Sequence, residues 1–279
     1  MADVNIGIQL ASLRMPLKKA LLTAARLGAQ GVEIDVRQDI RPDELSDTGR
    51  RQLRKLLDDL NLRVTSIRFH TARGYDEPEN LERRIDGTKQ AMRFAYSLGA
   101  SVVVNQIGRV PRITIAKIDG AAGEESPGET DASSINAHGS LVQCLTDLAR
   151  YGQHVGAMLA AETGSEPGEH LAELLDSLRE TAMGIAFNPG NLIINDFSVE
   201  DAIRSCARHT LLVHAKDGVR DRARGRGVEV PLGRGTAEFP HIIACLEEHR
   251  YRGWYVIERD YSEDIVPALQ YAVQFLRNL

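Results

Sequence analysis

Short apolar segments alternate with amphipathic segments along the chain, and this alternation limits the available folds more than any other feature. The apolar segments have the length and β-branched content of strands, and the amphipathic segments repeat their apolar residues at helical spacing. The expected strands cover residues 4–10, 31–35, 62–69, 101–105, 155–161, 184–187, 211–217 and 253–257. The expected helices cover residues 17–27, 47–60, 78–98, 135–151, 167–180, 199–207, 238–249 and 265–276. Eight such units predict one α/β domain over residues 1–279, a single (β/α)8 TIM barrel. A doubly wound sheet is the alternative, but it would not usually need eight complete units.

Polar residues stand at the ends of the third to the eighth expected strand. In a TIM barrel the active site lies at the C-terminal ends of the strands, so residues far apart in sequence meet there. Any one of them fits a structural role, since a lone histidine at a strand end is usually structural and a glutamate often pairs with an arginine. Their shared position favours a functional site. The residues are His70, Asn105, Gln106, Glu162, Asn188, Asn191, His214, Lys216, Glu258, Arg259 and Asp260.

Four of these residues have the donor atoms of a metal site. Glu162 and Glu258 offer carboxylates, His214 an imidazole and Asn188 an amide oxygen. Oxygen ligands with one nitrogen suit Mg²⁺, Mn²⁺ or Co²⁺ better than an ion that prefers thiolates. We therefore expect a divalent cation at this end of the barrel.

Two long polar segments interrupt the pattern, at about residues 108–134 and 218–236. Loops of this length are uncommon in compact domains and are usually functional or disordered. The second contains the arginine-rich stretch Arg220–Arg226, which fits either a solvated loop or a loop that holds an anionic or polyhydroxyl substrate.

Composition removes several classes of protein. The chain is 43% hydrophobic and 26% charged, as in globular proteins, and has no apolar run long enough to span a membrane. Its start lacks the pattern of a signal peptide, and its three cysteines lie far apart, which predicts a reduced, cytoplasmic protein. A net charge of -5 and the lack of basic clusters with aromatic residues argue against nucleic-acid binding.

Several motifs resemble those of the sugar phosphate isomerase/epimerase superfamily, the xylose isomerase-like TIM barrels, over nearly the whole chain. The more specific ones are His-x-Lys-Asp and a Gly-x-Gly followed by Tyr-x-Gly-x-x-x-x-Glu. The matching segments are Ala161–Glu162, Phe187–Leu192, His214–Asp217, Pro231–Gly235 and Tyr251–Glu258.

The resemblance implies a divalent metal held by Glu162, Asn188, His214 and Glu258, with the two glutamates also transferring the proton. The family usually has aspartate at position 188, so the asparagine removes one negative charge and should weaken metal binding. The resemblance also matches Arg220 to the family's substrate-binding arginine, and a homo-oligomer is compatible with it.

We further expect His70, Asn191 and Lys216 to bind substrate. Asn191 stands where many epimerases have histidine. Lys216 could stabilise developing negative charge, or it could only pair with the neighbouring Asp217.

Together these features predict a metal-dependent isomerase or epimerase that moves a proton on a keto sugar or related polyol through an enediolate. The alternatives are a dehydratase or lyase that starts from the same enolate, and a sugar-binding barrel without activity, which Asn188 favours. A nuclease with a three-metal cluster is disfavoured, because only His70 and His214 stand at the expected strand ends.

Overall fold

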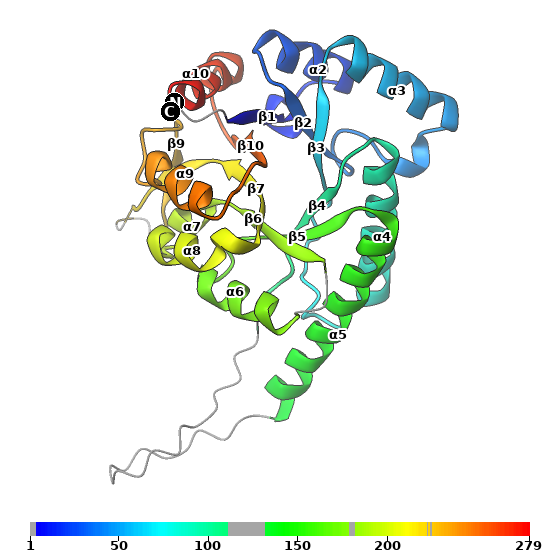
Figure 1. Ribbon diagram of the computed structural model, residues 1–279, viewed down its shortest axis with the longest axis vertical. Helices are drawn as coiled ribbons and strands as arrows, with labels where there is room; N and C mark the ends of the chain where they lie inside the picture. The colour runs from blue at the N-terminus through cyan, green and yellow to red at the C-terminus, as the bar shows by residue number, and fades with distance from the viewer. Residues whose placement is uncertain (1–3, 111–131, 179–181, 222, 224) are drawn as a thin grey trace.

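Eight parallel strands close into a barrel in the computed structural model, which describes residues 4–110, 132–178, 182–221, 223 and 225–279. Neighbouring strands follow the order β1-β10-β7-β6-β5-β4-β3-β2, and β1 pairs with β10 to close the ring (Figure 1). The predicted TIM barrel is therefore confirmed. The strands are β1 (Asn5–Gln9), β2 (Gly31–Asp35), β3 (Arg63–Arg68), β4 (Val102–Asn105), β5 (Met158–Glu162), β6 (Met183–Phe187), β7 (Thr210–Ala215) and β10 (Trp254–Ile257).

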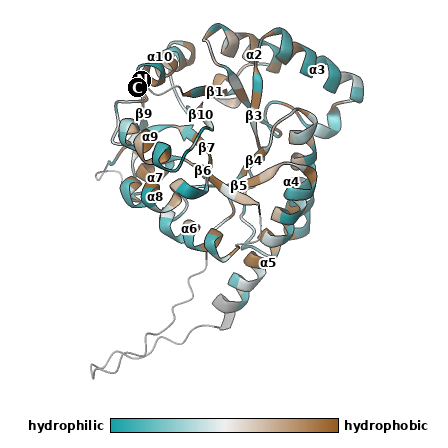
Figure 2. Cartoon of the chain, viewed as in Figure 1, coloured by the Kyte–Doolittle hydropathy of each residue, from teal (hydrophilic) through white to brown (hydrophobic). Residues whose placement is uncertain are grey.

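A ring of helices surrounds the barrel, and each helix carries both hydrophobic and hydrophilic residues (Figure 2). In α3, for example, Leu53 and Leu57 lie one turn apart and are buried, and the Ser46 side chain caps the first turn by accepting from the Gly49 N–H. The outer helices are α2 (Leu17–Arg26), α3 (Asp47–Asp59), α4 (Leu81–Ser97), α5 (Ala132–Val155), α6 (Gly168–Ser177), α8 (Val199–Cys206), α9 (Phe239–Glu248) and α10 (Ile265–Arg277).

Apolar side chains fill the lower part of the barrel interior. They form a separate cluster of buried residues: Val102, Val104, Ala160, Ala186, Leu212 and Val256. Because side chains alternate along a strand, the residues two positions after the last four face the same interior, one layer higher. These are Glu162, Asn188, His214 and Glu258, and their place at the C-terminal end of the barrel follows from this alternation.

The structure differs from the sequence-based expectation at two strands and in several short elements. The strand expected over 211–217 ends at Ala215, and Asp217 belongs to a separate two-stranded sheet. Helix α5 runs to Val155 and Gly156 follows with a positive φ of 88°, so β5 begins at Met158 and not at Val155. In the segment expected as a loop at 218–236, two short antiparallel strands pair, β8 (Asp217–Val219) and β9 (Val228–Val230). Residues 111–131 of the other expected loop lie outside the described residues. The unpredicted elements are α1 (Leu10–Leu13), η1 (Pro42–Glu44), α7 (Pro189–Ile194), η2 (Ala207–His209), β8 (Asp217–Val219) and β9 (Val228–Val230).

Among the described helices, none has both the length and the apolar character that crossing a membrane requires.

Candidate functional site

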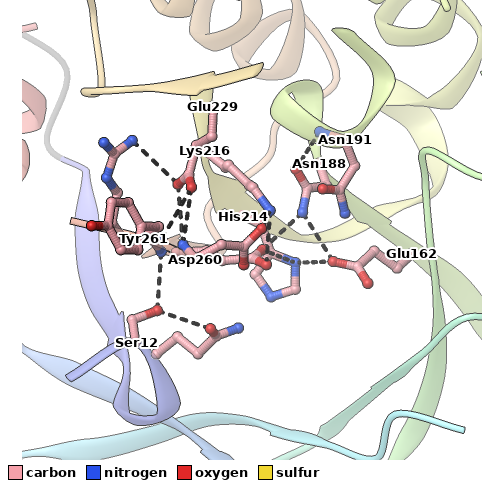
Figure 3. A network of polar contacts seen from close by, with 12 residues as sticks. Ser12, Glu162, Asn188, Asn191, His214, Lys216, Glu229, Asp260 and Tyr261 are labelled. Atoms are coloured by element: carbon pink, nitrogen blue, oxygen red, sulfur yellow. Dashed lines mark hydrogen bonds and ion pairs between the residues drawn. The ribbon is translucent and has the colours of Figure 1, made fainter. Parts of the chain in front are cut away.

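Three buried carboxylates and one histidine form the centre of the site. The His214 ring lies between two of the carboxylates, with Nδ1 3.0 Å from Glu162 Oε1 and Nε2 3.0 Å from Glu33 Oε2 (Figure 3 shows the Glu162 side). Glu258 Oε2 is 3.7 Å from the same Nδ1. All four side chains are at most 3% exposed, so their charges interact with little screening by water. Strands β2, β5, β7 and β10 thus bring one cluster together from four sides of the barrel.

The Arg68 side chain, at the end of β3, enters this cluster as a cation. Its guanidinium lies 3.4 Å from Glu162 Oε2, 3.6 Å from Glu258 Oε1 and 4.0 Å from Glu33 Oε1. Burial favours the neutral form of Arg68, but the surrounding carboxylates outweigh burial and raise its pKa further. Arg68 is therefore the counter-ion that all three carboxylates share.

The Asn188 amide links two of the carboxylates through its nitrogen. Its Nδ2 donates to Glu162 Oε1 at 2.9 Å and to Glu258 Oε2 at 2.8 Å. Its Oδ1 points the other way and accepts the backbone N–H of Asn191 at 3.0 Å, which caps helix α7 (Figure 3). If the amide were flipped, Asn188 Nδ2 would face the Asn191 backbone N–H, and two donors would meet. The hydrogen bonds therefore favour the orientation described.

Lys216 reaches the cluster from the end of β7. Its buried Nζ lies 3.4 Å from Glu258 Oε1 and also bonds the Asp260 carboxylate. The alternative in which Lys216 pairs with Asp217 is therefore wrong. The Asp217 carboxylate instead accepts backbone N–H groups from Gly218 and from the loop after β9, at Gly233, Gly235 and Ala237. These bonds explain why the His-x-Lys-Asp and Gly-x-Gly motifs occur together.

Opposite charges within the cluster hold several of its side chains in their ionised forms. Burial would raise the pKa of Glu33, but the charges of His214 and Arg68 and hydrogen bonds from His214 and Ser66 lower it to about 2. Burial opposes the ionisation of Glu162 too, yet Arg68 and His214 hold its pKa below the ordinary range. Burial favours neutral His214, but Glu33 and Glu162 raise its pKa to about 10. At neutral pH the ionised Glu33 and Glu162 thus lie beside cationic Arg68 and His214, and the charges of Glu258 and Asp260 keep nearby Lys216 protonated.

Other residues predicted at the site lie at varying distances from it. His70 is half-buried at the rim, where burial and the charge of Arg68 lower its pKa. Asn105 is occupied by Thr71 and by the Tyr75 hydroxyl, which gives it a structural role. The half-exposed Arg220 pairs with Asp196 at 2.9 Å, and the structure does not bring it to the cluster. Its role in substrate binding stays a prediction, as do the roles of His70, Asn191 and Lys216.

A polar cleft of about 220 Å³ gives access to the cluster. Arg68 and Glu258 of the cluster line it, and most of its other lining side chains can donate or accept hydrogen bonds. The cleft is therefore suited to a small polyhydroxylated ligand. A larger groove of about 1040 Å³ lies between η1 and α4 and contains no side chain of the cluster. The other lining residues of the cleft are Gln9, Ala11, Ser12, Arg14, Asp35, Gln38, Arg259 and Asp260.

Part of the cluster has the spacing of a metal site. Glu162, His214 and Glu258 each offer one ligand atom, all within 4.8 Å of one another, so these residues could hold a metal ion. Their neighbours fit such an ion poorly, because Asn188 presents N–H groups and Arg68 lies 3.4 Å from Glu162. Asn188 could bind such an ion through Oδ1 only by giving up its bond to the Asn191 N–H. The four-ligand site that includes Asn188 stays a prediction.

Glu33 and Arg68 are absent from the residues predicted above, because both lie within the expected strands 31–35 and 62–69 and not at their ends. A signal was present in the sequence. Glu33 stands between Val32 and Ile34, and Arg68 between Ile67 and Phe69. A charged residue flanked by apolar residues in a barrel strand faces the opposite side from them, which here is the barrel interior.

Asp39 accepts a hydrogen bond from the backbone N–H of Asp35, a residue that lines the cleft, and the protonation of Asp39 should control stability near neutral pH. Burial raises its pKa from 3.8 to about 7, against the hydrogen bond from the Asp35 N–H and with the help of the negative charges of Asp35 and Glu33. Between these values the folded chain binds a proton that the unfolded chain does not, so stability falls as the pH rises. Asp39→Asn should raise the melting temperature at pH 8 by about 3 °C or more and change it little at pH 4. Thermal unfolding from pH 4 to 8, with exposed Asp43→Asn as the control, measures this; an equal shift at both pH values would contradict it.

Comparison with protein families gives one broad match. The family model described as a xylose isomerase-like TIM barrel matches residues 21–279. The rhizopine catabolism protein MocC of Rhizobium meliloti is 30% identical over 155 residues, which are 48% of this chain and 46% of that protein. The chain thus spans less than half the length of MocC in this alignment. Inosose dehydratase of Clostridium perfringens is 22% identical over 244 residues, 80% of this chain and 77% of the dehydratase.

Solved structures share the fold over the whole chain. A xylose isomerase domain protein from Planctomyces limnophilus has a TM-score of 0.77 at 23% identity, covering 99% of this chain and 96% of that one. D-psicose 3-epimerase, solved in the presence of D-fructose, has a TM-score of 0.73 at 13% identity and covers 99% of both chains. At these identities the structural similarity shows a shared fold alone.

Proposed function

Because the chain belongs to the xylose isomerase-like TIM barrel family, we propose that it is an enzyme that moves a proton on the carbon next to the carbonyl of a polyhydroxy ketone. One observation carries the proposal. Glu162 and Glu258 are buried carboxylates joined through the Asn188 amide and next to the cations Arg68 and His214, and Glu258 lines a polar cleft. General acid–base catalysis needs proton acceptors and donors of this kind at fixed positions around the substrate.

The ionisation states favour a base and an electrophile in the same site. Arg68 and His214 keep Glu162 ionised at neutral pH, so its carboxylate can accept a proton. Lys216 stays protonated, because Glu258 and Asp260 outweigh its burial and raise its pKa. Removing a proton next to a carbonyl moves negative charge onto the carbonyl oxygen, and a fixed cation within reach lowers the barrier to that step.

No step of this mechanism passes through a metal ion, because Asn188 and Arg68 leave poor room for one among the carboxylates. Substrate hydroxyls would bind along the cleft wall, where Gln9, Ser12 and Gln38 can donate and accept hydrogen bonds. Titration of the protein with Mn²⁺ tests the divalent-ion dependence expected from the sequence.

The enolate formed in this way has two outcomes. Return of a proton to carbon gives isomerisation or epimerisation, the kind of reaction for which the structural neighbour D-psicose 3-epimerase is named. Loss of a neighbouring hydroxyl gives dehydration, and this second candidate is favoured by inosose dehydratases that align with 80% of the chain. Dehydration needs an acid for the leaving hydroxyl, and we assign this role to the Lys216 ammonium, which lies 3.4 Å from Glu258 Oε1.

Deuterium uptake tests the shared first step. We expect the chain, incubated in D2O with a panel of ketoses and inososes, to introduce deuterium next to the carbonyl of at least one of them. Mass spectrometry and proton NMR then separate the outcomes. An epimer or isomer carries deuterium at unchanged composition, whereas a dehydration product has lost the mass of one water. A compound that binds, as followed by calorimetry, while no panel member exchanges with or without Mn²⁺ would indicate a binding barrel and contradict the proposal.

A further inference from the structure

We propose that Arg68 takes the place of a metal ion in this barrel: its guanidinium compensates the buried carboxylates and binds the carbonyl oxygen on which negative charge develops. The charge-compensating part of this inference stands on the geometry alone. The catalytic part rests on the proposed function.

The first observation is a free donor atom in the right place. Arg68 Nη1 is buried and finds no hydrogen-bond acceptor among the described residues, although Glu258 Oε1 and Glu33 Oε1 lie 3.6 and 4.0 Å away. Buried guanidinium N–H groups without an acceptor are costly and rare, so such a group calls for an explanation. Arg68 also lines the polar cleft that leads to the cluster. A substrate oxygen in the cleft would supply the missing acceptor.

The second observation is independent of Arg68. The Asn188 amide directs both N–H bonds at Glu162 and Glu258, the carboxylates that would otherwise bind a metal. The Asn191 backbone holds the amide in this orientation. Arg68 and Asn188 therefore both present N–H groups to Glu162 and Glu258. This is the arrangement expected where a cationic side chain, and not a metal ion, compensates the carboxylates.

The chemistry balances without a further reagent. A carboxylate, Glu162 or Glu258, takes the proton from the carbon next to the carbonyl. The C–H electron pair forms the carbon–carbon double bond of the enolate, and the carbonyl π pair moves onto the oxygen, which accepts a hydrogen bond from Arg68 Nη1. Return of a proton to carbon restores the carbonyl, and nothing is oxidised or reduced. A guanidinium stays protonated throughout, so Arg68 acts only as an electrostatic donor.

Mn²⁺ binding tests the inference without any substrate. Titration followed by the electron paramagnetic resonance of free Mn²⁺ should show no stoichiometric binding to the wild-type protein at micromolar concentrations. Arg68→Met removes the competing cation and Asn188→Asp adds a carboxylate. Each should tighten Mn²⁺ binding by about 10- to 100-fold, and the double variant should bind most tightly. Stoichiometric wild-type binding at micromolar Mn²⁺, or no tightening in any of the three variants, would overturn the inference.

Arg68→Met could lose stability, since it leaves three carboxylates without their shared cation. Its melting temperature should then rise on addition of Mn²⁺, because an ion that binds only the folded state stabilises it, while the wild type should not respond. Arg68→Lys keeps a charge but loses the planar fork, and should fold and stay indifferent to Mn²⁺. Arg37→Met is the matched control, because exposed Arg37 stacks on Phe69 and contacts no carboxylate of the cluster.

The catalytic part has a separate readout. Deuterium uptake by the wild type should need no added metal, and Arg68→Lys should slow it about 100- to 1000-fold. Uptake that occurs only with Mn²⁺ and survives in Arg68→Met would refute the inference while the proposed function stands. If no ketose exchanges and the Mn²⁺ pattern is as expected, the proposed function fails and the charge-compensating role of Arg68 is retained.

Discussion

Glu162→Gln should slow deuterium uptake into a ketose substrate by about 100- to 10,000-fold, the range over which positioned acid–base groups act. Glutamine keeps the size of the side chain but cannot accept the substrate proton. It would also leave Arg68, now 3.4 Å from Glu162, with one anion fewer. The measurement is the rate of deuterium incorporation at saturating substrate, taken together with the melting temperature so that a loss of fold is recognised.

Glu258→Gln distinguishes the roles of the two carboxylates. If Glu162 removes the proton and Glu258 returns one on the other side, Glu258→Gln should still exchange label into the recovered substrate but form little epimer. Exposed Glu263→Gln is the matched control and should leave both rates unchanged. A folded Glu162→Gln protein that exchanges label at the wild-type rate, together with a folded Glu258→Gln protein that forms epimer at the wild-type rate, would exclude these glutamates as the acid–base pair.

The sequence is sufficient to predict the barrel and to predict that three site residues lie close together. Strand and helix periods repeat so regularly that the closed fold follows, and the strand-end rule brings Glu162, His214 and Glu258 together. Positions set by the alternation of side chains are thus predictable from sequence. The same rule, extended to charged residues inside strands, would have found Glu33 and Arg68.

Two properties of the site depend on contacts that no local pattern contains. The direction of the Asn188 amide follows from the Asn191 backbone N–H, which exists only because α7 begins there. The place of Glu33 follows from a register shift between β2 and β3 after Val32, which sets Glu33 opposite Ser66 and lets the Ser66 hydroxyl donate to it at 2.7 Å. Arg220 shows the converse: its match to a motif did not bring its side chain to the cluster.

Glu33→Gln should lower the melting temperature by about 6 to 20 °C near pH 6, because breaking a buried ion pair costs about 3 to 5 kcal/mol and each kcal/mol is worth about 2 to 4 °C in a chain of this size. Glu33 accepts from Gln9 Nε2 at 2.9 Å, from Ser66 Oγ at 2.7 Å and from His214 Nε2 at 3.0 Å. A glutamine can meet only part of this set, and it leaves the His214 and Arg68 cations with less compensation.

The effect of Glu33→Gln on stability should depend on pH, and it should shrink at both acid and alkaline pH. The Glu33 pKa is lowered from 4.5 to about 2, so its contribution to stability is complete above 4.5 and is lost as the pH falls toward 2. The His214 pKa is raised from 6.5 to about 10, so its contribution is complete below 6.5 and is lost as the pH rises toward 10. The difference in melting temperature between the wild type and Glu33→Gln should therefore be largest from about pH 4.5 to 6.5 and smaller at lower and higher pH. The Glu44 side chain is 65% exposed, so Glu44→Gln should have the melting temperature of the wild type at every pH. A Glu33→Gln protein as stable as the wild type at pH 6 would mean that Arg68 and His214 do not need this carboxylate, and that Glu162 and Glu258 hold both cations alone.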